Sequence, residues 1–135
     1  MICLSKPFSW PVRVYYEDTD AGGVVFYANY LKFMERARTE LLRSKGFEQD
    51  DLMIHEGILF AVRSIQVEYL KPARFNQLLH VSAEIKQIKK ASLEFFQQIT
   101  HHDRLLVTGE VRIAGLDVNT LKPKVIPENL LKHFI

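Results

Sequence analysis

The sequence has few cysteines, no long hydrophobic run and almost no net charge, and each shortage excludes a class of protein. Its only cysteine, Cys3, rules out an internal disulfide framework and suits a reducing compartment. The formal net charge of +2 is too balanced to indicate nucleic acid or an anionic membrane surface as a partner. No stretch approaches the roughly 18 apolar residues of a membrane span, and residues 1–11 lack the apolar core of a signal peptide. We therefore expect a cytoplasmic protein without an integral membrane segment.

Several catalytic and metal-binding patterns are also missing. There is no GxSxG, GxxxxGK[ST] or GxGxxG motif, which sets aside serine hydrolases, P-loop proteins and dinucleotide-binding proteins. Neither HxxxH nor HExxH occurs, and Cys3 has no neighbour at metal-binding spacing, so we expect no metal site. What remains is an ordinary globular mixture of 135 residues, 47% hydrophobic and 25% charged. Residues 1–135 are therefore predicted to form one domain with a proper core.

Hydrophobic periodicity predicts one strand, one long helix and then four strands. Alternation after Pro11 predicts a strand over 12–16. The helix is predicted over 29–45 and ends before Gly46, which suits the position after a helix C-terminus. Its apolar face holds Tyr30, Phe33, Met34, Ala37 and Leu41. Beyond an irregular or short helical connection at 50–57, alternation predicts strands at 64–69, 79–86, 92–99 and 105–118, with turns at Lys89-Lys90-Ala91 and His102-Asp103.

This order of elements predicts an α+β fold. One amphipathic helix needs a large apolar surface to cover it, and consecutive antiparallel strands provide a curved one. We therefore expect a sheet of about five strands wrapped around one long central helix. Its edge strand would be long and open, which favours pairing with a second copy of the chain.

The segment 16–46 carries most of the chemistry. It places Asp18 and Asp20 before the Gly22-Gly23 pair and then the helix. A carboxylate there lies beside backbone N–H groups without intrahelical partners and beside the positive end of the helix dipole. Spacing alone favours a simple helix cap and a solvated turn residue. The alternative is a carboxylate that acts on a carbonyl polarised by these N–H groups, with glycines that allow a ligand close to the main chain.

Four nearby residues have less specific interpretations. Asn29 is a candidate N-cap of the helix, and Tyr27 supplies one of the N–H groups without an intrahelical partner. Tyr30 fits the apolar face and is predicted to belong to the core. Glu35, one turn beyond Asn29, is an acid/base rival of the aspartates, although a surface carboxylate is the simpler interpretation.

Lys89 and Lys90 occupy a predicted hairpin tip. Such a pair is most simply a solvated turn, but paired cations at a loop also bind phosphates. Lys71 and Arg74, on either side of Pro72, could add to a phosphate-binding patch.

The run VYYEDTDAGGVVFYANYLKFMERARTE, residues 14–40, resembles the hotdog-fold acyl-CoA thioesterases of the 4-hydroxybenzoyl-CoA thioesterase group. Within that group it is most similar to the Tol–Pal-associated thioesterases of Gram-negative bacteria. Weaker similarity extends over almost the whole chain, including RSIQVEY at 63–69 and LKPKVIP at 121–127.

The resemblance implies a hotdog fold, a homodimer or homotetramer with active sites at subunit interfaces, and hydrolysis of acyl-CoA without a cofactor other than the coenzyme A of the substrate. It also implies that Asp20 is the catalytic carboxylate and that the Tyr27 backbone N–H polarises the thioester carbonyl. Lys89 and Lys90 stand where the family contacts the coenzyme A phosphates, and Gly22 and Gly23 border the substrate.

The side chain of Tyr27 marks a departure. Many Tol–Pal-associated members have His at this position, whereas the hydroxybenzoyl enzyme has Tyr, so aliphatic and aromatic acyl groups both stay open. Any residue except proline supplies the N–H. Two other functions compete with hydrolysis: a weakly catalytic scaffold that binds acyl-CoA, acyl carrier protein or an envelope-associated partner, and a hotdog hydratase or dehydratase. The absence of His near the helix start disfavours the latter.

Overall fold

A computed structural model describes residues 8–133 of the chain. Cys3 and the rest of the N-terminal segment lie outside the described residues, as do residues 134 and 135. The strands are β1 (Phe8–Arg13), β2 (Ile58–Tyr69), β3 (Leu78–Ile88), β4 (Ser92–His101) and β5 (Arg104–Asp117). The helices are α1 (Asn29–Ser44), α2 (Gln49–Asp51) and α3 (Glu128–Leu131), with a 3-10 turn at Tyr16–Asp18 and a π-helical turn at Leu52–Glu56.

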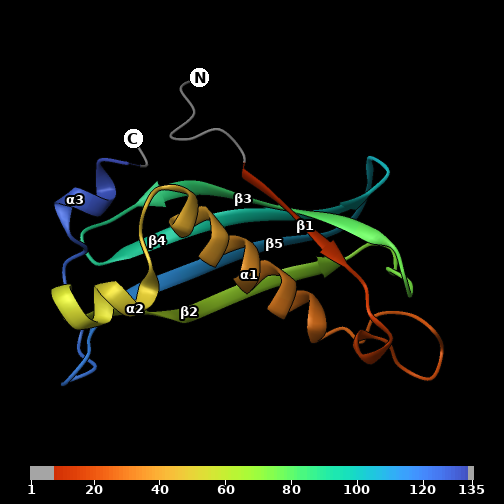
Figure 1. Ribbon diagram of the computed structural model, residues 1–135, viewed down its shortest axis with the longest axis horizontal. Helices are drawn as coiled ribbons and strands as arrows, with labels where there is room; N and C mark the ends of the chain where they lie inside the picture. The colour runs from red at the N-terminus through yellow and green to blue at the C-terminus, as the bar shows by residue number, and fades with distance from the viewer. Residues whose placement is uncertain (1–7, 134–135) are drawn as a thin grey trace.

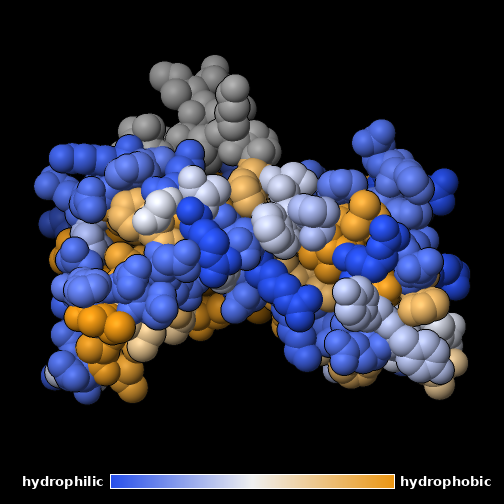
Figure 2. Space-filling view, in the orientation of Figure 1, coloured by the Kyte–Doolittle hydropathy of each residue, from blue (hydrophilic) through white to orange (hydrophobic). Residues whose placement is uncertain are grey.

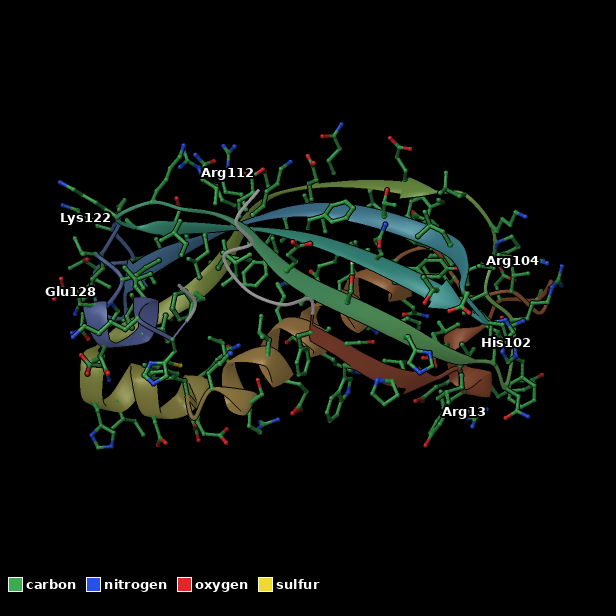
Figure 3. The ribbon with its side chains drawn as sticks, turned by 90° about the horizontal axis from the view of Figure 1, so that it is seen from above. Arg13, His102, Arg104, Arg112, Lys122 and Glu128 are labelled. Carbon is green, nitrogen blue, oxygen red and sulfur yellow. The ribbon has the colours of Figure 1, made fainter. Side chains whose placement is uncertain are left out.

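All five strands form one antiparallel sheet in the order β1-β3-β4-β5-β2. The long helix α1 crosses one face of this sheet (Figure 1). Seen from above, the sheet curves over the helix, and Arg112 points away from the opposite face (Figure 3). The predicted α+β arrangement of one long helix and five strands is confirmed.

The core lies between α1 and the sheet. Phe33, Met34 and Ala37 are fully buried, as the helical periodicity predicted. The helix approaches the sheet most closely at Gly109 of β5, where an added Cβ would lie 2.9 Å from the Sδ and Cε atoms of Met34. Gly109 therefore sets how near α1 packs to the middle of the sheet.

The first strand was predicted wrongly. It covers Phe8–Arg13 rather than 12–16, and the chain turns into the 3-10 segment after Tyr15. Pro11 lies inside the strand because β1 is at an edge and pairs with β3 alone, so a missing N–H can be tolerated. The second strand also begins earlier than predicted, at Ile58, and is irregular between Val62 and Ser64.

The long open edge of the sheet is β2. Val62, Ile65 and Tyr69 on this strand are 52%, 38% and 47% exposed. Hydrophobic residues lie along the lower margin of the molecule, which is hollowed at its middle, on the side where β2 runs (Figure 2). In the described part of the chain, no helix has the length and apolarity needed to cross a membrane.

Candidate active site

The segment before α1 folds into a tight loop. Thr19 and Val25 form an antiparallel bridge, and the Asp20 N–H donates to the Val24 carbonyl at 2.9 Å. Gly23 closes the loop with φ of +77°, a conformation that favours glycine. A further hydrogen bond, from the Val25 N–H to the Ala73 carbonyl at 2.9 Å, joins the loop to the segment after β2. Asp20 is therefore carried on a loop that is fastened at both ends.

Asp18 has a structural role in this loop. Its Oδ2 accepts the Tyr15 N–H at 2.8 Å, and its carbonyl accepts the Phe26 N–H at 3.0 Å and the Asn29 side-chain amide at 2.9 Å. The predicted N-cap role of Asn29 is wrong: Asn29 is the first helical residue, and Ala28 occupies the cap position without a side-chain bond. The Asn29 side chain instead reaches back to hold the loop against the helix.

Asp20 caps nothing in α1. Its side chain is exposed, and Oδ1 accepts the Gly22 N–H at 2.9 Å. Within residues 8–133 no donor contacts Oδ2. One carboxylate oxygen is thus oriented by the loop and the other is available to a ligand.

The start of α1 leaves backbone donors available. The first helical N–H groups bend into short bonds, from Asn29 to the Phe26 carbonyl at 2.8 Å and from Tyr30 to the Tyr27 carbonyl at 3.4 Å. The N–H groups of Tyr27 and Ala28 donate to no acceptor in the described residues. With the dipole of a 16-residue helix behind them, they form a site for negative charge.

Aromatic side chains cluster at the start of α1. Tyr69 on β2 donates its hydroxyl to the Tyr27 carbonyl at 3.3 Å, and its ring lies 5.6 Å from that of Tyr30. Tyr30 is buried, as predicted, and its hydroxyl accepts the Ala73 N–H at 2.9 Å. Burial raises the pKa of Tyr30 against that hydrogen bond, with smaller contributions from Tyr69 and Asp20. Tyr30 therefore stays neutral and provides an apolar wall.

Lys89 and Lys90 lie at the other end of the sheet. They form the predicted turn between β3 and β4, closed by the Lys89 N–H to the Ser92 carbonyl at 2.9 Å. Tyr69, which contacts Tyr27, pairs with Val107 on β5, and Ser92, which closes the lysine turn, pairs with Ala114. Val107 and Ala114 are seven residues apart along the strand, so about 23 Å separates them. Figure 1 shows this turn and the loop before α1 at opposite ends. One chain therefore does not bring the two sites together.

Lys71 and Arg74 follow β2 and lie on the side of Asp20, so their expected patch with Lys89 is not formed within one chain. Arg74 forms a bridge with Val24, inside the Asp20 loop. In Figure 3, Arg13, His102 and Arg104 mark one end of the sheet, and Lys122 and Glu128 mark the other. Arg74 is therefore a basic residue beside the Asp20 loop and does not join Lys89 and Lys90 in one patch.

Two buried polar residues were not anticipated. Arg38 on α1 is 8% exposed and donates to Oε1 of the fully buried Gln97 at 2.9 Å. The Gln97 amide in turn donates to the carbonyls of Met34 and Ser82 at 3.0 and 3.1 Å. The signal was present in the sequence, since Gln97 interrupts the inward alternation of Leu93, Phe95 and Ile99.

The fold and the loop before α1 define a hotdog protein of the thioesterase class. The family profile of the thioesterase-like superfamily matches residues 14–134, and the chain belongs to this family. The chain is 45% identical over 128 residues to the acyl-CoA thioester hydrolase YbgC of Escherichia coli, covering 94% of this chain and 95% of that protein.

Solved structures of thioesterases share this fold. A probable thioesterase from Bartonella henselae is 36% identical, with a TM-score of 0.87 over 90% of this chain and all of that one. A 4-hydroxybenzoyl-CoA thioesterase variant in complex with 4-hydroxybenzoyl-CoA shares the fold at 14% identity, with a TM-score of 0.89 over 97% of this chain and 100% of that one. The predicted family and hotdog fold are confirmed, and the chain is a thioesterase.

Proposed function

We propose that this protein hydrolyses acyl-CoA thioesters to a free acid and coenzyme A, with Asp20 as the catalytic carboxylate. The observation that carries the proposal is the arrangement at the start of α1. Oδ1 of Asp20 is oriented by the Gly22 N–H at 2.9 Å, and the Tyr27 and Ala28 N–H groups have no acceptor in the described residues. The activity of the E. coli relative supports acyl-CoA as the substrate class.

Two routes are compatible with this geometry. Asp20 can attack the thioester carbonyl, expel the coenzyme A thiolate and form a mixed anhydride that water then hydrolyses. Alternatively, Asp20 removes a proton from water, which attacks the carbonyl directly. In both routes the carbonyl oxygen becomes negative, and the Tyr27 N–H at the helix start stabilises it. Gly22 and Gly23 would border the substrate, and the missing Cβ at Gly22 leaves Oδ1 of Asp20 uncrowded. The chain's own groups suffice for either route, so we propose no cofactor beyond the coenzyme A of the substrate.

We propose that the complete site needs two copies of the chain. If two β2 edges pair antiparallel about a two-fold axis, the Lys89–Lys90 end of one copy faces the Asp20 end of the other. The exposed apolar side chains of Val62 and Ile65 support β2 as the contact. Lys89 and Lys90 would then bind the coenzyme A phosphates of a substrate whose thioester lies at the partner's loop.

Thiol release from a panel of aliphatic and aromatic acyl-CoAs tests the activity, because Tyr27 leaves both classes open. Hydrolysis well above the uncatalysed rate for at least one acyl group is expected. Background rates throughout, together with capture of acyl carrier protein or an envelope protein in a pull-down, would favour the scaffold function instead. Location in the cytoplasm and association with the Tol–Pal system stay predictions.

The role of the lysines has a sharper test. In the double variant Lys89→Ala/Lys90→Ala, KM for acyl-CoA should rise while KM for the matching acyl-pantetheine, which lacks the nucleotide phosphates, should not. An equal change for both substrates would remove the lysines from phosphate binding.

A further inference from the structure

A cavity away from the Asp20 loop contains the buried guanidinium of Arg38, which forms no ion pair within residues 8–133. It measures about 120 Å³ and lies between α1 and the sheet. Its polar lining comes from Glu35, Arg38, Thr39 and Gln49, and its apolar lining from Leu42, Phe60, Val62, Leu93, Phe95 and Ile113. Arg38 lies ten residues beyond the helix cap at Ala28, roughly 15 Å along the axis. The cavity is therefore separate from the catalytic loop of the same chain, and Val62 places it next to the β2 edge proposed as the subunit contact.

The guanidinium of Arg38 has few hydrogen-bond acceptors among the described residues. Its one hydrogen bond goes to Gln97, and its remaining N–H groups meet no acceptor in residues 8–133. None of the ion pairs in this part of the chain involves Arg38. Burial lowers the pKa of Arg38 to about 10, with Glu35 opposing the shift, so the group stays charged at neutral pH. A buried, unpaired charge is costly, and an anion would offset that cost.

The rest of the cavity suits a small organic acid. Guanidinium binds carboxylates with two parallel hydrogen bonds. Next to it, Thr39 accepts a hydrogen bond from Gln49 at 3.1 Å and keeps its own hydroxyl proton to donate. Phe95 and Ile113 are buried and form an apolar lining for a short alkyl body. The volume is several times the ~10–15 Å³ that a cavity needs to hold one water molecule, so it admits a ligand of several heavy atoms.

We propose that this cavity binds a short aliphatic carboxylate, with Arg38 as its ion-pair partner. The carboxylate has two sources with the same chemistry: a free short-chain acid, or the far end of an acyl group that carries a second carboxylate. Glu35, which also lines the cavity, is exposed and lowers the affinity, because its charge has the same sign as the ligand's.

Binding of butyrate, measured by calorimetry or NMR titration, tests the cavity without any catalysis. Wild type should bind butyrate more tightly than butyramide, its uncharged isostere. Arg38→Met should weaken butyrate binding about tenfold or more, since a hydrogen bond to a charged group is typically worth this much. Arg36→Met is the matched control, because Arg36 is exposed on the same helix and does not line this cavity. Glu35→Gln should strengthen binding.

Arg38→Met leaves the buried Gln97 oxygen unpaired and can destabilise the fold. Thr39→Leu therefore provides a second variant, which puts a bulkier, apolar side chain into the cavity lining and keeps the Arg38–Gln97 bond; it should also abolish butyrate binding. The proposal is overturned if wild type binds butyrate no better than butyramide, or if folded Arg38→Met or Thr39→Leu binds butyrate like wild type.

Kinetics distinguish the two sources of the carboxylate, and this measurement rests on the proposed hydrolysis. If the acyl group supplies the carboxylate, the ratio of kcat/KM for succinyl-CoA to that for butyryl-CoA should fall about tenfold in Arg38→Met. If the free acid is the ligand, this ratio stays constant while butyrate binding is still lost. If the chain showed no thioesterase activity, the proposed function would be wrong. The butyrate titration would still test the cavity, because it does not depend on catalysis.

Discussion

The two ends of α1 differ: the C-terminal end is capped, whereas the N-terminal end is open. At the C-terminal end, Gly46 has φ of +89°, its N–H reaches the Arg43 carbonyl and the Phe47 N–H reaches the Leu42 carbonyl, both at 3.0 Å. This is a complete Schellman motif, which satisfies the last carbonyl groups of the helix. At the N-terminal end, no side chain caps the helix and the Tyr27 N–H is left without an acceptor in the described residues.

The difference separates stability from chemistry. A closed end contributes to the folded state, whereas donors left open beside a carboxylate are available to a substrate. The loop at the open end is nevertheless well fastened, through Asp18 and Asn29. We therefore expect changes to the open donors and to the Asp20 carboxylate to lower activity with little loss of stability, and changes at the closed end to do the reverse.

Among changes to the two ends of α1, the largest effect should come from Tyr27→Pro, which removes the proposed oxyanion donor. Loss of one such donor typically lowers kcat by about 10²–10³-fold. Proline suits the start of a helix, and the Tyr27 N–H holds no bond in the described structure, so thermal unfolding should change little. Tyr27→Ala keeps the N–H and should retain most of kcat. Equal losses in both variants would show that the side chain, not the N–H, matters.

A smaller loss is expected for Gly22→Ala. An added Cβ would lie 3.3 Å from Oδ1 of Asp20, close enough to displace the carboxylate that the Gly22 N–H orients. We expect kcat to fall about tenfold, since small misplacements of catalytic groups are costly, with the unfolding midpoint nearly unchanged. Steady-state kinetics at saturating substrate measure this. Normal kcat would mean that the carboxylate position is not critical.

Gly46→Ala should affect only stability. Alanine is strained at this positive φ, and the cost should be about 1 kcal/mol or somewhat more, which denaturant unfolding can measure. The matched variant is Gly23→Ala, at φ of +77° on the open side. It should lose similar stability and also lose activity. A loss of kcat in folded Gly46→Ala would break the contrast between the ends.

The smallest effect concerns His101, the last residue of β4, on the side of the open end. Burial, His102 and Arg104 lower its pKa from 6.5, so the neutral form is favoured in the folded state. Its stabilising contribution is complete above about pH 6.5 and is lost as pH falls through the lowered pKa. Wild type should therefore lose slightly more thermal stability than His101→Gln between pH 7.5 and 5. Parallel curves would contradict this.

The sequence predicts the regular parts of the fold well because periodicity records burial. The face of Tyr30, Phe33 and Met34 follows from spacing alone, and so does the cap at Gly46. The failures lie where tertiary context overrides local pattern. Pro11 looked like the boundary of a strand, but an edge position tolerates it. Asn29 looked like a cap, but its side chain holds the Asp18 carbonyl.

The candidate site was predictable only in part. Composition and spacing favoured a cap over a catalyst, and the length of the family resemblance singled out Asp20. The sequence could not show that Asp18 is engaged by Tyr15 while one oxygen of Asp20 is unbonded in the described residues, because these contacts depend on loop geometry. Nor could it show that Lys89 is far from Asp20, since strand register decides that separation.

The most direct test of the central claim is kcat of Asp20→Asn with the best acyl-CoA substrate. Asparagine is nearly isosteric and its amide oxygen can still accept the Gly22 N–H, so folding and substrate binding should be retained. We expect kcat to fall about a thousandfold or more, with Asp18→Asn as a control that loses some stability and keeps most activity. A near-normal kcat for folded Asp20→Asn would contradict the assignment of Asp20 as the catalytic carboxylate.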